Sequence, residues 1–302
     1  MSGPVVVLAG GTGGAKLARG MLDLVGDDLV VIANTGDDIE IYGAYVSPDP
    51  DLVTFWLADR IDERGWGLAG DTFAVVDGLR ELGVDVWFKL GDRDLAIGLE
   101  RARRLDDGER LTEAHAAITG ALGVGARVLP MSDRPVRTWV RAHGRAWPFQ
   151  EFMIRAAGKG PIEDVDLRGV RSAPPSDEVL EAIATAAAIV IGPSNPIVSI
   201  GPILALPGLC EALASSPAPV VAVSPFVSGA VLKGPTKEFM ASSELSPDAE
   251  GIAVAYEGVI DGLVADDRTD RIPLLHTDVL MADGAGRRRV AEETLRFAQA
   301  LG

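Results

Sequence analysis

A run of five apolar residues near the N-terminus is followed by four glycines and a lysine, a combination that could bind phosphate. Val5–Ala9 is typical of a buried strand, Gly10-Gly11-Thr12-Gly13-Gly14 turns the chain, and Lys16 belongs to the amphipathic helix that follows. Glycines before a helix N-terminus expose N–H groups at the positive end of a dipole. The sequence therefore predicts a phosphate-bearing ligand here, with a tight turn lacking any ligand as the alternative.

The turn departs from both common phosphate-binding fingerprints. A P-loop has glycine before its lysine and serine or threonine after it, whereas Ala15 and Leu17 flank Lys16. A dinucleotide-binding turn has a third glycine where Lys16 stands, and an acid follows its second strand where Asn34 stands. We therefore expect neither a P-loop nor a dinucleotide site.

Acidic and amide side chains follow the second predicted strand, Leu29–Ala33. Asn34, Asp37 and Asp38 come directly after it. Ligands of open parallel sheets bind beyond the carboxyl ends of the strands, so these side chains should share the crevice of the glycine turn. Carboxylates beside a phosphate repel it unless a hard cation intervenes, and Mg²⁺ is the usual choice. An Asx-type turn with solvated acids is the alternative.

The segment Ser47-Pro48-Asp49-Pro50-Asp51 presents two further carboxylates. Its prolines fix an extended segment, and a helix is expected from Leu52. Asp49 is a third candidate ligand of Mg²⁺, beside Asp37 and Asp38. Asp51 could act on a substrate or could cap the helix.

Charged residues also follow Val84–Leu90, which we interpret as a third strand. Lys89 lies in this run, and Asp92, Arg93 and Asp94 come after it. At the same sheet edge, these side chains could bind anions or cations.

A second junction of small residues follows the predicted strand Ala188–Ile191. It reads Gly192-Pro193-Ser194-Asn195-Pro196. Such a crevice suits a purine base or a ribose, with Ser194 and Asn195 as polar selectors. A turn without a ligand is the alternative.

The composition restricts the class of protein. The 302 residues are 47% hydrophobic, which indicates a well-buried core, and the net charge of −16 disfavours nucleic acid as a partner. The single cysteine fits a reducing cytosol, so we expect a cytoplasmic location. We expect neither a membrane helix nor a signal peptide.

The predicted fold is α/β, with a Rossmann-like, mostly parallel sheet, flanking helices and an inserted β-rich lobe. Residues 1–125 and 177–302 form the core, and 126–176 form the lobe. Ile252–Tyr256 is expected to be a further strand. The charge run Arg101–Arg110 is interpreted as a solvated face.

The motifs together resemble those of the 2-phospho-L-lactate transferase (CofD/FbiA) family. They are the glycine turn, Asn34–Asp38, Ser47–Asp51, Lys89–Asp94 and Gly192–Pro196, in this order over nearly the whole chain. The resemblance implies transfer of a phosphoenolpyruvyl or 2-phospho-L-lactyl group from a guanosine diphosphate-linked donor to the 8-hydroxy-5-deazaflavin Fo. GMP is released, and the product is a precursor of coenzyme F(420). It also implies a Mg²⁺ requirement and a homodimer.

Family resemblance implies roles for individual residues. Asp51 and Lys89 align with positions that contact Fo, and the donor pocket falls at the glycine turn and at Ser194-Asn195-Pro196. Asp51 could accept the proton of the attacking hydroxyl or only bind the ribityl chain. Lys16 and the glycine N–H groups would share the diphosphate charge with Mg²⁺. A non-catalytic nucleotide-sugar-binding regulator of the gluconeogenesis-factor type is the alternative function.

Overall fold

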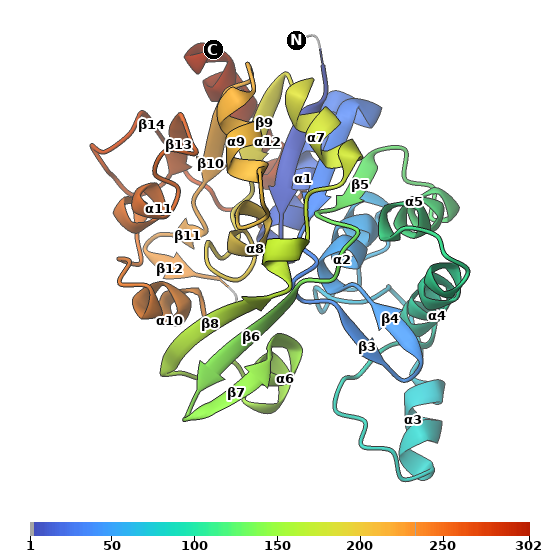
Figure 1. The fold of residues 1–302 in the computed structure, drawn as a ribbon. Coiled ribbons are helices and arrows are strands. Elements are labelled where there is room, and N and C mark those ends of the chain that lie inside the picture. The colour runs from blue at the N-terminus through green and yellow to red at the C-terminus, as the bar shows by residue number, and fades with distance from the viewer. Residues whose placement is uncertain (1–2, 233) are drawn as a thin grey trace.

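A computed structural model describes residues 3–232 and 234–302. Within these residues, seven parallel strands form one central sheet with helices on both faces (Figure 1). Across the sheet the order is β14 (Leu274–His276), β13 (Gly262–Ala265), β10 (Val220–Val223), β9 (Ala188–Ile191), β1 (Val5–Ala9), β2 (Leu29–Ala33) and β5 (Arg127–Pro130). The predicted α/β class with a parallel sheet is confirmed.

Both faces of the sheet are covered, which explains why its strands are continuous apolar runs. Alternate residues of β1 enter two different cores. One core contains residues of α7 (Asp177–Ala184), α8 (Gly201–Leu204), α9 (Leu209–Ser215) and α11 (Ala249–Ala255). The other contains residues of α1 (Gly11–Val25), α2 (Pro48–Leu57) and α12 (Gly284–Leu301). No helix in the described part of the chain is long and apolar enough to cross a membrane.

Three excursions from the sheet extend beyond one of its ends, although α5 (Leu111–Ala121) of the first lies beside β5 (Figure 1). The first comprises β3 (Ile39–Ile41), β4 (Ala44–Val46), α3 (Ala74–Glu81), α4 (Asp92–Asp106) and α5. The second is an antiparallel sheet of β7 (Arg145–Pro148), β6 (Arg137–Ala142) and β8 (Ile162–Arg168), with α6 (Phe149–Arg155). The third comprises β11 (Phe226–Val227), β12 (Ala230–Val231) and α10 (Thr236–Ser242).

The antiparallel sheet corresponds to part of the lobe predicted at 126–176. β5 falls within that range but pairs in parallel with β2, so it is the edge strand of the main sheet. The antiparallel strands themselves lie within 137–168. The division into a core of 1–125 and 177–302 and a separate lobe stays a prediction.

Two strand predictions are wrong. Val84–Leu90 is not a strand and lies outside the sheet between α3 and α4, because its apolar side chains pack with residues of the β3–β4 hairpin instead. Ile252–Tyr256 falls largely in helix α11, which Asp248 caps by accepting the N–H of Gly251 at 2.9 Å. In both cases a short apolar run packs on a different partner from the one expected.

Candidate active site

The turn between β1 and α1 lies at the centre of the site. Gly11 begins α1 with a φ of +63°, which favours glycine, and its N–H donates to Asp49 Oδ1 at 2.7 Å. The carbonyl of Gly10 accepts a hydrogen bond from the Ser194 hydroxyl. The turn is therefore tied both to α2 and to the loop after β9.

Close packing requires three of the four glycines. A Cβ on Gly13 would lie 1.9 Å from the carbonyl oxygen of Pro193, and one on Gly10 would lie 2.6 Å from Ser199 Cβ. A Cβ on Gly14 would lie 2.9 Å from the backbone of β1. Contact with the loop after β9 accounts for Gly10 and Gly13, and contact with β1 accounts for Gly14, without a ligand. Phosphate binding at the turn stays a prediction.

Asp49 and Asp37 are buried beside the turn. Asp49 Oδ2 accepts from Asn34 Nδ2 at 3.0 Å, and Asn34 Oδ1 accepts the N–H of Gly36 at 2.7 Å. Asp37 Oδ1 is buried and has no hydrogen-bond partner among the described residues. Burial, together with the charge of Asp49, raises the pKa of Asp37 well above its usual range. Burial also raises the pKa of Asp49 to about 6. A cation would stabilise both carboxylates.

Asp38 is separated from this pair by its own partners. Tyr45 Oη donates to Asp38 Oδ2 at 3.0 Å, and Ser47 Oγ donates to Oδ1 at 2.7 Å. Burial raises the pKa of Asp38 to about 7. Across residues 3–232 and 234–302, no three His, Cys, Asp or Glu side chains form a group that could hold a metal ion. A cation at Asp37 and Asp49 would therefore need oxygen ligands from a substrate or water.

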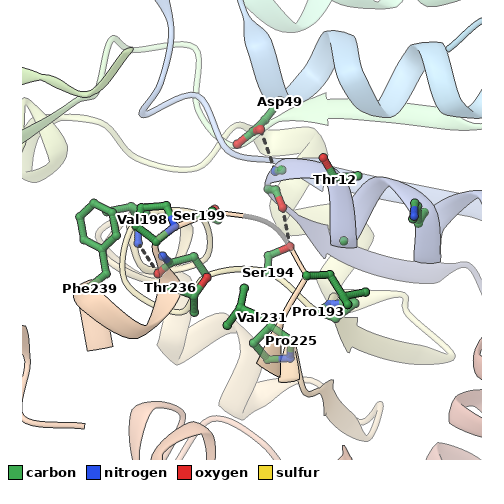
Figure 2. Close-up of a pocket in the computed structure, with 18 of the residues that line it drawn as sticks. Thr12, Asp49, Pro193, Ser194, Val198, Ser199, Pro225, Val231, Thr236 and Phe239 are labelled. Carbon is green, nitrogen blue, oxygen red and sulfur yellow. Dashed lines mark hydrogen bonds between the residues drawn. The ribbon is translucent and has the colours of Figure 1, made fainter. Parts of the chain in front are cut away.

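A cavity of about 460 Å³ opens in front of the turn. Figure 2 shows residues that line it, among them Thr12, Asp49 and Ser194. Its polar lining includes Gly10–Gly13, Lys16, Asp37, Asp49, Ser194, Asn195 and Ser199. Its apolar lining includes Phe149 and Met153 of α6, Val231 of β12 and Phe239 of α10. A polar wall opposite an apolar wall suits a ligand that joins a flat ring to a charged group.

Lys16 brings a positive charge to the polar wall. Its Nζ donates to the carbonyl of Met281 at 3.3 Å and lies 5.8 Å from the ring centroid of Trp56. Because Lys16 lies in the second turn of α1, its charge adds to the positive end of the helix dipole. The structure thus brings together Lys16, Asp37 and Asp49, as the sequence predicted.

Comparison with known proteins assigns the family. The family model for 2-phospho-L-lactate transferase CofD matches residues 5–288. The chain is 42% identical to a phosphoenolpyruvate transferase of Kitasatospora aureofaciens over 298 residues, which cover 91% of this chain and 93% of that protein. It is 39% identical to a 2-phospho-L-lactate transferase of Methanosarcina mazei over 266 residues, 87% of each chain. The chain belongs to the CofD family.

Membership of the CofD family makes this chain a transferase of coenzyme F(420) biosynthesis, which transfers a phospholactyl or phosphoenolpyruvyl group to Fo. A solved structure of a UPF0052-family protein from Bacillus halodurans aligns with a TM-score of 0.63 and 20% identity. That alignment covers 97% of this chain and 99% of the other, and it shows a shared fold alone.

Only part of the motif Gly192–Pro196, which follows β9, lines the cavity. Ser194 and Asn195 line the cavity, and Asn195 Oδ1 accepts the N–H groups of Ile197 and Val198 at 2.9 and 3.3 Å. Pro196 is buried behind them and does not line the cavity. The carboxamide oxygen of Asn195 is thus already used to close its own turn.

Asp51, for which the family resemblance implies a contact with Fo, lies outside this cavity. Both of its oxygens accept hydrogen bonds from the buried guanidinium of Arg101. The expected helix start at Leu52 is wrong because α2 begins at Pro48, and Asp51 is therefore inside the helix rather than at its cap. Its role toward Fo stays a prediction.

Lys89, Asp92 and Arg93 also lie outside the cavity. Lys89 Nζ lies 4.0 Å from the ring centroid of Phe73. The Asp92 carboxylate accepts two backbone N–H groups at the start of α3, at 2.9 and 3.1 Å. Arg93 donates to a backbone carbonyl of the preceding loop at 3.3 Å. These contacts hold α3 and its loop in place, and substrate binding by the three residues stays a prediction.

Sequence reasoning missed the apolar wall and Arg101. Phe239 of α10 lies far along the chain from Phe149 and Met153 of α6, so no local pattern marks it as their neighbour. Arg101 begins a charge run that we expected to be solvated, yet its side chain is 0% exposed. A spacing of three residues, with Leu95 and Gly98 also buried, could have placed Arg101 on the inner face of α4.

Proposed function

We propose that the cavity binds the guanosine diphosphate-linked donor of the CofD-family reaction, with its diphosphate at the start of α1 and its base against the apolar wall. One observation supports this most directly. A buried carboxylate oxygen of Asp37 has no partner in a cavity that also contains a helix N-terminus and Lys16. The N–H groups of Thr12 and Gly13 have no partner within the helix, because they belong to its first turn.

Asp37 and Asp49 fit a Mg²⁺ ion shared with the donor. Mg²⁺ is held by one or two carboxylates together with phosphate oxygens, so a pair of acids suffices. Bound there, the ion would neutralise the diphosphate and the departing GMP. We leave Asp38 out of the proposed ligand set because, unlike Asp37 and Asp49, it does not line the cavity.

The transfer itself depends on positioning. The terminal ribityl hydroxyl of Fo attacks the phosphorus that carries the lactyl or enolpyruvyl oxygen. The bond from that phosphorus to the bridging oxygen breaks, and GMP leaves. Lys16 and the start of α1 hold the donor during this step. Asp51 could accept the hydroxyl proton on a lone pair that Arg101 leaves free, and binding of the ribityl chain alone is the other role open to it.

Product analysis tests the proposed function. Purified protein is incubated with Fo, Mg²⁺ and either the lactyl or the enolpyruvyl guanylylated donor, and products are identified by mass. We expect GMP release and a phosphodiester of Fo with at least one donor, and loss of both after removal of Mg²⁺ with EDTA. No product with either donor, or full activity with EDTA, contradicts the proposal.

Two matched variants test the carboxylates. Asp37→Asn removes the proposed ligand and should raise the Mg²⁺ concentration for half-maximal rate by about tenfold or more, since loss of a charged contact costs about 1.5–3 kcal/mol. Asp38→Asn makes the same change at the next residue and should leave that concentration nearly unchanged. Equal effects of the two variants contradict the assignment.

The proposed enzyme is a cytoplasmic homodimer, following the family and the composition. Light scattering coupled to size exclusion measures the assembly directly. A mass of one chain, about 31.6 kDa, would contradict the dimer.

A further inference from the structure

Arg101 is a buried charge that the reaction as described does not use. It lies in the second half of α4, its side chain is 0% exposed, and it packs between α2 and β4. Burying a guanidinium costs free energy that an ion pair regains only with good geometry. Its presence therefore requires an explanation.

The contacts of Arg101 join three elements. Nη1 donates to the carbonyl of Tyr45 at 2.8 Å and to Asp51 Oδ2 at 3.1 Å, and Nη2 donates to Asp51 Oδ1. A two-pronged contact of this kind fixes the direction of the carboxylate as well as its distance. Arg101 thereby attaches both α2 and β4 to α4.

The first turn of α2 carries two carboxylates on opposite sides. Asp49 and Asp51 are two residues apart, which corresponds to a rotation of about 200° around a helix. Asp49 contacts Gly11 and Asn34 on the side of the cavity, whereas Asp51 contacts Arg101 on the side of α4. Rotation or displacement of this turn at Asp51 must therefore also move Asp49.

Stability alone does not account for the ion pair. Apolar residues of similar volume often replace a buried ion pair without loss of stability. They cannot, however, impose the direction that the guanidinium imposes on Asp51. The contact of Tyr45 supports the same reading, since its carbonyl accepts from Arg101 while its hydroxyl donates to Asp38 behind the acidic pair.

We propose that Arg101 is a positioning residue for the transfer reaction. Through Asp51 it fixes the first turn of α2, and it thereby holds the Asp49 carboxylate against the start of α1. This role rests on the proposed function only through the assignment of Asp49 to a cation.

Two variants of the pair and one control test this role. The double variant Arg101→Leu/Asp51→Leu removes both charges and leaves an apolar contact, and Arg101→Lys keeps the charge but loses the two-pronged geometry. Arg103→Leu is the control, because Arg103 lies on the same helix and is 55% exposed. Each protein is measured for melting temperature, for Mn²⁺ affinity without nucleotide by electron paramagnetic resonance, and for kcat and KM of both substrates.

We expect the double variant to melt near the wild-type temperature, to bind Mn²⁺ more weakly and to lose about 10- to 100-fold in kcat with little change in the KM of the donor, because the reacting groups are displaced by a fraction of an ångström. Arg101→Lys should lose less, and Arg103→Leu should match the wild type. A folded double variant with wild-type kcat overturns the role of Arg101. If the double variant does not fold, wild-type kcat in Arg101→Lys overturns it.

Asp49→Asn separates this role from the proposed cation site. If Asp49→Asn binds Mn²⁺ as the wild type does, the cation assignment fails. The kcat of the folded variants then decides whether Arg101 is a positioning residue. If Asp49→Asn loses Mn²⁺ affinity while the double variant keeps it, the cation site stands and the positioning role of Arg101 is overturned.

Discussion

Gly13→Ala tests whether the β1–α1 turn must touch the loop after β9 for activity. The new Cβ would lie 1.9 Å from the carbonyl oxygen of Pro193, whereas real Cβ contacts under 3.0 Å are essentially never seen. Because the contacting atom belongs to the backbone, the loop after β9 must move away from α1 by about 1 Å. A shift of that size in an active site can lower the rate about 100-fold. Overpacking should also lower the free energy of unfolding by about 1–3 kcal/mol.

The assay pairs urea unfolding with the rate of GMP release. Gly120→Ala in α5 is the control, because a Cβ there meets nothing within 4 Å. It should raise the free energy of unfolding by about 0.5 kcal/mol and leave kcat/KM unchanged, since alanine has the higher helix propensity. Wild-type stability and wild-type kcat/KM in Gly13→Ala would refute the reasoning from close packing.

Three further predictions concern single side chains. Lys16→Met should raise the KM of the donor about tenfold and leave that of Fo unchanged, because a charge-assisted contact contributes about 1.5–3 kcal/mol; steady-state kinetics with each substrate varied measures both. Ser194→Ala should lower the free energy of unfolding by about 1 kcal/mol, since the carbonyl before α1 loses its donor. Burial, Asp51 and Asp71 raise the pKa of Asp94 to about 7, so its ionisation between about pH 4 and 7 opposes folding. The contribution of this group to the free energy of unfolding therefore falls as pH rises through that window. Urea unfolding at pH 5 and at pH 7.5 measures this fall, and the difference between the two pH values should be smaller in Asp94→Asn.

The central sheet could be predicted because its strands are buried on both faces. β1, β2, β9 and β10 are continuous apolar runs bounded by turn residues, which is the pattern of buried parallel strands. Val84–Leu90 is also rich in apolar residues but includes Asp85 and Lys89, and it packs on a hairpin instead of a sheet. A short apolar run does not specify its partner, and this is why that strand prediction is wrong.

The candidate site could be predicted where it follows the ends of strands. Asn34 and Asp37 come directly after β2, and Ser194 follows β9, so the sheet brings them to one edge. This rule does not predict the position of Asp51, because α2 begins earlier than expected and directs the Asp51 carboxylate toward α4. The apolar wall depends on contacts between distant segments, which spacing along the chain does not encode, whereas the spacing of Arg101 from Leu95 and Gly98 indicates its face of α4 but not its partners.

The pairing of β1 has a consequence for how the protein is made. One side of β1 pairs with β2, but the other pairs with β9, which begins only at Ala188. During synthesis on the ribosome, one edge of β1 therefore stays unpaired until nearly two hundred residues have emerged. An unpaired edge of an apolar strand can pair with strands of other chains. The loop that closes the site follows β9 directly. Phe239 of α10 and Met281 also line the cavity, so the cavity is complete only after these later segments have been added, and a ribosome that stalls before β9 leaves that edge of β1 unpaired.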